Sequence, residues 1–184
     1  RDEIFDALQR RETFATSGSR LRIRFFAGDL PEDIGERDNA IALAYKQGVP
    51  MGADLGVSVS PRFWVWASQD PNGAPLDRIQ VIKGWVEDGE QHQRVRDVVC
   101  SSGRLPNADG RCPATTASVD IESCELKGDE GAAQLQQTFT DPDFSPEQNA
   151  FYYVRVLENP TCRWTTLLAN SANEDLPVDV PATE

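Results

Sequence analysis

The sequence predicts a mainly β, α+β fold, namely an antiparallel β-sandwich-like domain with an N-terminal helix and one or two short helices. Short stretches rich in Val, Ile, Phe, Trp and Tyr follow one another, and turn residues, including 12 Pro and 13 Gly, separate them. Helical periodicity appears only in short segments, chiefly at the N-terminus. With 184 residues, the chain is long enough for one domain with a sizeable core.

The most strand-like run of the chain is Phe151–Glu158. Alternate residues fall on opposite faces, and each face carries one charged residue, Arg155 on one and Glu158 on the other. A strand that is largely apolar on both faces is typical of the middle of a sheet. Asn159-Pro160 ends it, because proline has no N–H for a ladder. We therefore expect a central strand here, with the earlier strands around it.

The residues before this strand supply the other elements. Ile4, Phe5 and Leu8 form an apolar stripe at helical spacing, so we expect a helix over 1–11. Strands at 61–68, 76–85 and 93–100, joined by tight turns, are expected to form an antiparallel meander. The other expected elements are strands at 13–16 and 21–26, an acidic loop at 28–38, a helix at 40–47, a turn at 49–52, a loop-rich stretch at 101–131 with a short strand at 118–121, and a segment at 131–140 that fits helix or strand equally well.

The net charge of the chain argues against two classes of binding partner. A net charge of −12 repels nucleic acid and anionic membranes, so neither is expected as a partner. The arginines cluster once, at Arg20, Arg22 and Arg24, where they alternate with apolar residues and read as a solvated or salt-bridged strand face. No run approaches the ~20 apolar residues of a membrane span.

The four cysteines favour disulfides and an oxidising compartment. Cys100 and Cys112 flank a loop full of turn residues, so we pair them as a local bridge. Cys124 and Cys162 are then left to join a loop to the end of the strand at 151–158. Four reduced thiols in a cytosolic protein remain the alternative. Because His92 is the only histidine, a histidine-based metal site or a catalytic triad within the chain is not expected.

Other side chains suggest chemistry only weakly. Acidic pairs such as Asp70 with Asn72, or Asp141 with Asp143, could hold calcium, but they lack the spacing of an EF-hand loop and are better explained as turn residues. Trp64 lies two residues before Trp66, on the same face of a predicted strand, where the pair could bind a sugar. Core packing is the commoner role of such rings.

Several stretches together resemble a bacterial family described as domain of unknown function 3604, whose core is similar to the polymerase-and-histidinol-phosphatase (PHP) metallohydrolases, including the carbaryl-hydrolase-like group. The stretches are Arg1–Gly18, Pro50–Leu55, Asp77–Trp85, Asp141–Phe144 and Phe151–Trp164. They occur in family order over nearly the whole chain. The resemblance implies that this is the C-terminal portion of a longer protein, and the helix at 1–11 starts without a cap of its own, as expected of such a piece.

The resemblance implies three regions: the last helix and strand of a truncated hydrolase core over 1–27, a β-rich C-terminal domain over 28–169, and an extended tail over 170–184. The family's His-x-His motif and its other metal ligands lie upstream. No catalytic or metal-binding residue is therefore assigned to this chain, and no cofactor is expected in it. A divalent metal is expected in the upstream domain.

Our leading hypothesis is an accessory, structural region of a PHP-like hydrolase, inactive alone, whose partner is the missing N-terminal core of the same protein. Residues placed nearest a substrate are Thr16, Ser17, Arg163 and Trp164. Family members that look exported agree with the disulfides, so a periplasmic or secreted bacterial protein is expected. The alternatives are a free-standing secreted binding module, for carbohydrate through Trp64 and Trp66, and an interaction domain or homo-oligomer with an apolar patch on the helix at 1–11.

Overall fold

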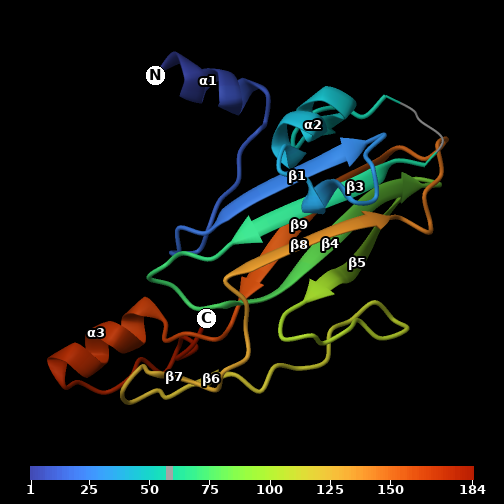
Figure 1. Ribbon diagram of the computed structural model, residues 1–184. Coiled ribbons are helices and arrows are strands. Elements are labelled where there is room, and N and C mark those ends of the chain that lie inside the picture. The colour runs from blue at the N-terminus through green and yellow to red at the C-terminus, as the bar shows by residue number, and fades with distance from the viewer. Residues whose placement is uncertain (57–59) are drawn as a thin grey trace.

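Two antiparallel sheets face each other and enclose the main core (Figure 1). The computed structural model describes residues 1–56 and 60–184. The first sheet has the strand order β2-β1-β3-β8 and the second β5-β4-β9, while β6 and β7 form a separate ribbon. The strands are β1 (Arg22–Gly28), β2 (Gly48–Pro50), β3 (Arg62–Ser68), β4 (Leu76–Glu87), β5 (Glu90–Cys100), β6 (Ser118–Val119), β7 (Leu126–Lys127), β8 (Gln134–Thr140) and β9 (Ala150–Glu158). The predicted β-rich fold class is confirmed.

The core lies between the inner faces of the two sheets. Phe63 and Val65 of β3, exposed by 1% and 0%, pack with Leu76 and Ile79 of β4, both fully buried. Alternation places Phe63 and Val65 on one face of β3, and the register shift between Leu76 and Arg78 lets both Leu76 and Ile79 of β4 face the core. Arg20, Arg22 and Arg24 are exposed, as predicted for a solvated face.

A second, smaller core covers the outer face of the first sheet. The helix α2 (Ala40–Gln47) and the 3-10 turn η1 (Ile34–Glu36) lie over this face (Figure 1). They bury Ile34 and Ala44 completely against Phe26 and Trp64. The small alanine side chains let the helix approach the sheet closely. The predicted helix at 40–47 is confirmed.

Two predictions about strand placement are wrong. The strand at 151–158 is not central, because β9 is paired only with β4 and lies at the edge of its sheet, whereas β4 occupies the middle. The meander expected at 61–100 is split, because the chain crosses from one sheet to the other after β3. Alternation looks the same whether the next strand pairs beside a strand or packs across from it, so the pattern could not distinguish these arrangements.

Some predictions about individual elements are confirmed and others are wrong. The hairpin turn at Asp88-Gly89 joins β4 to β5, and the ambiguous segment at 131–140 contains strand β8. The strand expected at 13–16 is absent, since those described residues have no regular structure. An unpredicted helix, α3 (Trp164–Ala172), follows β9 and ends at Asn173, which adopts a left-handed conformation with φ 56°.

Both predicted disulfides are present. Cys100–Cys112 closes the loop after β5, and Cys124–Cys162 joins the β6–β7 ribbon to the start of α3. No cysteine is free. Loops 101–131 and helix α3 contain little core of their own, so the covalent links hold them to the sandwich. Within the described residues, no helix is long and apolar enough to cross a membrane.

Candidate functional site

The N-terminal helix α1 (Asp2–Gln9) carries the most exposed apolar stripe of the molecule's helices. Ile4, Phe5 and Leu8 are 68%, 60% and 59% exposed, and α1 has no buried residue. Figure 1 shows it standing clear of the sheets. Large apolar side chains at helical spacing are typical of a face that packs on another structure.

The segment after α1 is fixed to the sandwich although the helix is not. The Tyr45 hydroxyl of α2 donates a hydrogen bond of 2.5 Å to Glu12, and this bond raises the pKa of Tyr45. Arg11 forms an ion pair with Asp54 at 3.6 Å. At Gly52, with φ 86°, a β-carbon would meet the Arg11 carbonyl oxygen at 2.3 Å, so the two backbones touch there.

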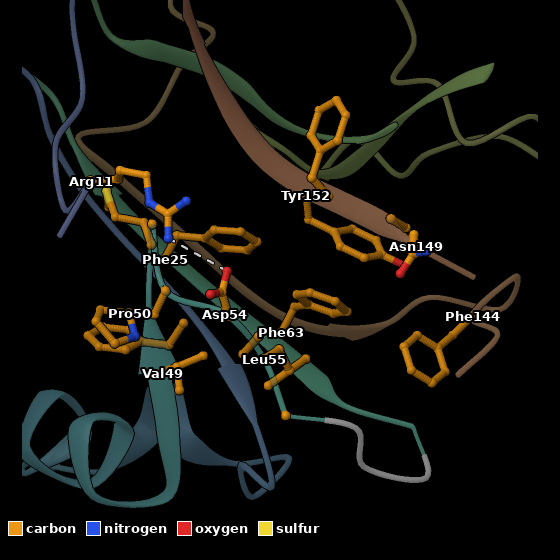
Figure 2. Close-up of a pocket in the computed structure, with 18 of the residues that line it drawn as sticks. Arg11, Phe25, Val49, Pro50, Asp54, Leu55, Phe63, Phe144, Asn149 and Tyr152 are labelled. Carbon is orange, nitrogen blue, oxygen red and sulfur yellow. Dashed lines mark ion pairs between the residues drawn. The ribbon is translucent and has the colours of Figure 1, made fainter. Parts of the chain in front are cut away.

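Beside this segment lies an aromatic cleft of about 470 Å³, which we call the edge cleft. It opens between β1 and β2 on one sheet and β9 on the other (Figure 2). Rings of Phe25, Phe63 and Tyr152 form its inner wall, with Phe144 farther out. The Phe25 and Phe63 ring centroids are 5.9 Å apart with planes 13° apart, and those of Phe63 and Tyr152 are 4.6 Å apart. The edge cleft is the candidate ligand site.

Tyr152 connects the cleft wall to a buried polar cluster. Its hydroxyl donates to Asp141 at 2.7 Å, and Lys83 Nζ lies 3.0 Å from the same carboxylate oxygen. Burial raises the pKa of Asp141, but the hydrogen bonds from Tyr152 and Lys83 together lower it by more than burial raises it. The pKa therefore lies below its usual value. Burial and the Asp141 charge raise the pKa of Tyr152 well above its usual value, so its hydroxyl stays a donor.

A second carboxylate extends this cluster toward solvent. Arg94 and Arg96, both on β5, form ion pairs with Asp143, and the Arg96 pair measures 2.6 Å. Their hydrogen bonds lower the pKa of Asp143. Together with Lys83 and Asp141, they fix the turn that leads from β8 toward β9 and so hold the outer part of the cleft.

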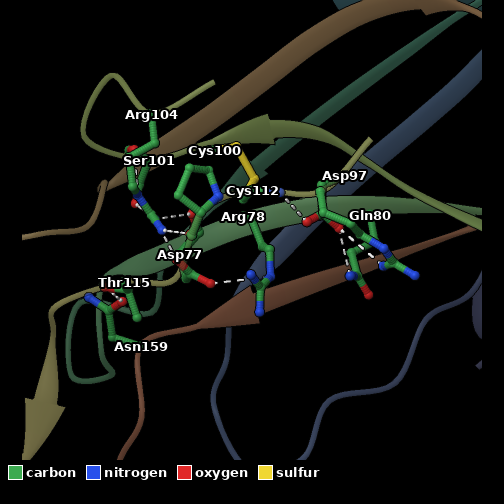
Figure 3. A network of polar contacts seen from close by, with 12 residues as sticks. Asp77, Arg78, Gln80, Asp97, Cys100, Ser101, Arg104, Cys112, Thr115 and Asn159 are labelled. Atoms are coloured by element: carbon green, nitrogen blue, oxygen red, sulfur yellow. Dashed lines mark hydrogen bonds and ion pairs between the residues drawn. A yellow bond between two sulfur atoms is a disulfide. The ribbon is translucent and has the colours of Figure 1, made fainter. Parts of the chain in front are cut away.

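A different polar network surrounds the Cys100–Cys112 disulfide (Figure 3). Asp77, 3% exposed, accepts from Arg104 at 2.5 Å. Asp97, 5% exposed, accepts from the Gln80 amide and from the Cys112 backbone N–H, each at 2.7 Å. The bonds from Arg104 and Cys112 tie the loop to β4 and β5, and the Gln80–Asp97 bond joins these two strands, so the network is structural.

The residues predicted nearest a substrate come from two separate segments. Thr16 and Ser17 are exposed in the connection between α1 and β1. Arg163 is the N-cap residue of α3, and Trp164 begins that helix with 63% exposure. None of the four is among the described residues that line the edge cleft. Their proximity to a substrate stays a prediction.

The tryptophan pair does not form an exposed platform. Trp64 is 2% exposed because Phe26, stacked on it at 5.8 Å between centroids, and the helix α2 cover that face of the sheet. Trp66 is partly buried beside the same cluster. A sugar therefore cannot lie across these two rings.

The acidic pairs act in turns, as predicted. Asp70 accepts backbone N–H groups of Arg20 and Asn72 at 2.7 and 3.0 Å, which lowers its pKa. Across residues 1–56 and 60–184, no three His, Cys, Asp or Glu side chains gather as ligands for a metal ion. His92 instead stacks on Trp85 at 5.3 Å.

Sequence reasoning missed the edge cleft. Its walls come from segments far apart in the chain, around residues 25, 50, 63 and 150, and each reads locally as ordinary core. The only local signal was the turn-rich stretch 141–146 before β9. Its role depends on Lys83, 58 residues from Asp141 in the sequence.

Fold and cleft together define a disulfide-stapled β-sandwich domain with an open, aromatic edge. The chain belongs to the family described as protein of unknown function (DUF3604), whose model matches residues 1–184. No curated protein and no solved structure matches the chain.

Proposed function

We propose that this chain is the C-terminal accessory region of a PHP-like, metal-dependent hydrolase and packs on the catalytic core through α1. The observation that carries the proposal is the exposure of Ile4, Phe5 and Leu8 on a helix with no buried residue. An apolar stripe of this kind is stabilised when another surface covers it. In this proposal, the upstream core supplies the metal ligands and the reaction, while this region supports the core.

The proposed location is the periplasm or the exterior of a bacterial cell. Two disulfides support an oxidising compartment, because thiols stay reduced in the cytosol. The divalent metal is proposed for the upstream core.

The test compares this chain with a longer polypeptide that includes the upstream residues. Hydrogen exchange is expected to slow at the α1 amides in the longer polypeptide, which should also carry a divalent metal and hydrolyse p-nitrophenyl phosphate. Leu8→Asp should restore fast exchange in α1, whereas Val178→Asp, at a site 96% exposed, should not. Equally fast α1 exchange in both polypeptides, or a longer polypeptide without metal, would refute the proposal. Slowing that depends on protein concentration would indicate a homo-oligomer instead.

A second candidate function is a secreted carbohydrate-binding module, and a different pair of rings favours it. Phe151 and Tyr153 of β9 are 62% and 41% exposed, with centroids 6.2 Å apart and planes within 16°. Nearly parallel exposed rings can pack against the C–H faces of a sugar chain. Affinity electrophoresis in gels containing xylan or soluble cellulose tests this function. Phe151→Ala should abolish retardation, and Phe14→Ala, at a ring 51% exposed, serves as the matched control.

A further inference from the structure

The edge cleft exists because the sandwich closes on one side only. On one side, β8 of the first sheet packs against β5 of the second. On the other side, the edge strands are β2, which has three residues, and β9. Between them the described residues leave about 470 Å³ open to the core rings. Ligand sites in proteins commonly have volumes of roughly 300–1,000 Å³.

The walls favour a flat, aromatic occupant. Phe25 and Phe63 present nearly parallel rings, and Tyr152 is tilted against Phe63 by 42°. Phe63 and Phe25 are 1% and 7% exposed, so packing fixes these two rings before any ligand arrives. They form a rigid floor behind Tyr152, which is half-buried and offers its ring to a stacked or edge contact with a ligand ring. Figure 2 shows Phe25, Phe63 and Tyr152 around the open space.

The charge of the walls favours an uncharged occupant. Of the 21 described lining residues only Arg11 and Asp54 carry charge. They have opposite signs and pair with each other at 3.6 Å, so the lining is neutral although the protein carries −12. A charged ligand would lose its hydration on entering the cleft and would find no unpaired opposite charge there to compensate. Gln148 and Asn149 provide amide groups for one polar substituent.

We propose that the edge cleft binds an uncharged, planar aromatic molecule with a single hydrogen-bonding group. The ring lies against Tyr152, the half-buried ring of the inner wall, and the polar group faces the Asn149 side of the cleft. The proposed contacts lie on the inner wall of the cleft and involve neither the exposed face of α1 nor the ring of Tyr153. Phe151 also borders the cleft and is shared with the carbohydrate proposal, so the two proposals are told apart by their ligands, indole for the cleft and a polysaccharide for the outer pair.

The test is a titration of the 184-residue chain with indole, followed by backbone amide chemical shifts. Indole should bind saturably with a Kd of about 1 mM or tighter. The shifts should gather at residues 49–56 and 144–152. Ala53→Trp places a large side chain at an exposed position of the mouth and should weaken indole binding at least tenfold. The matched control, Val178→Trp, should leave it unchanged within twofold.

Two further comparisons test the chemical class. Indole-3-acetate, the anionic analogue, should bind at least fivefold more weakly than indole, and cyclohexanol, which is not planar, should bind more weakly still. The double variant Arg11→Gln with Asp54→Asn keeps the lining neutral and should bind indole within twofold of the unchanged chain. The proposal fails if indole does not saturate, if Ala53→Trp binds it as well as Val178→Trp does, or if the anion binds more tightly.

Discussion

Helices α1 and α2 have the same length, eight residues, but opposite surroundings. In α2, Ala40 and Ala44 lie against the sheet and are 9% and 0% exposed. In α1, the larger side chains of Ile4, Phe5 and Leu8 remain mostly exposed. The helix with the stronger apolar stripe is therefore the one without a covering surface in the described chain. An apolar stripe shows that a helix has a face to bury, but it does not identify what buries it.

The third helix extends the comparison. α3 exposes Trp164, Leu167 and Leu168 by 63%, 51% and 59%, yet it is attached. A disulfide at Cys162 lies just before it, and Asn170 donates hydrogen bonds to the carbonyls of residues 121 and 122. Packing thus holds α2, and a disulfide holds α3 together with hydrogen bonds and the burial of Thr166 and Ala169, whereas α1 has no buried residue and no disulfide. Substitutions at these attachments should lower the free energy of unfolding most at α3, slightly less at α2 and least at α1.

The largest effect is expected at α3. The paired change Cys124→Ser and Cys162→Ser should lower the free energy of unfolding by about 4 kcal/mol, because it opens a loop with a sequence separation of 38. Hydrogen exchange should become fast throughout α3. The paired change at Cys100 and Cys112 opens a loop with a separation of 12 and should cost about 3 kcal/mol while α3 stays protected. Protection of α3 after loss of its own disulfide would show that packing holds it.

A slightly smaller effect is expected at α2. Ala44→Asp places a charge without a partner at a fully buried site and should cost at least about 3 kcal/mol in urea unfolding. Ala42→Asp, on the exposed side of the same helix, should cost only about 0.5 kcal/mol through helix propensity. Equal losses would mean that α2 does not depend on its contact with the sheet.

The hydrogen bond between Tyr152 and Asp141 should contribute less to stability than the attachments of α3 and α2, and its contribution should depend on pH. Tyr152→Phe removes the hydroxyl that donates to Asp141 and should cost about 2 kcal/mol at pH 7. The pKa of Asp141 is lower in the folded state than its usual value, so the carboxylate stabilises the fold above that value and loses this effect as the pH falls through the folded pKa. The difference between the variant and the unchanged chain should therefore shrink in acid. A difference that stays constant from pH 7 to pH 2 would contradict this account.

The smallest effect on the chain alone is expected at α1. Leu8→Asp should change the free energy of unfolding by less than about 0.5 kcal/mol, because the side chain is 59% exposed and packs on little. Urea unfolding measures this change beside Ala44→Asp. A loss comparable with that of Ala44→Asp would show that α1 is covered in solution, and the contrast between the two helices would disappear.

The sequence predicted what depends on neighbours close in the chain. The turn residues between Cys100 and Cys112 predicted a local bridge, and Asp88-Gly89 predicted a hairpin. Helix α3 was missed because it begins with Trp164 and two threonines, which favour strands, and has no acidic residue in its first turn.

What depends on distant neighbours could not be predicted. Strand β9 resembles a central strand because Phe151 and Tyr153 are apolar, yet both are exposed at the edge of the sheet. The edge cleft needs walls from both sheets, and the alternation of a strand does not reveal which sheet it joins. The candidate site was therefore visible only in the structure, while the fold class was visible in the sequence.

The pairing of β9 with β4 has a consequence for how this edge strand finds its place. Phe151 is aligned with Gly84 and its ring lies over that glycine, where a β-carbon would meet the ring at 2.3 Å. A slip by one residue would put Phe151 beside a residue that has a side chain, and would turn Tyr152 away from Asp141. The absence of a side chain at position 84 therefore favours this one register of β9 on β4 over the registers shifted by one residue.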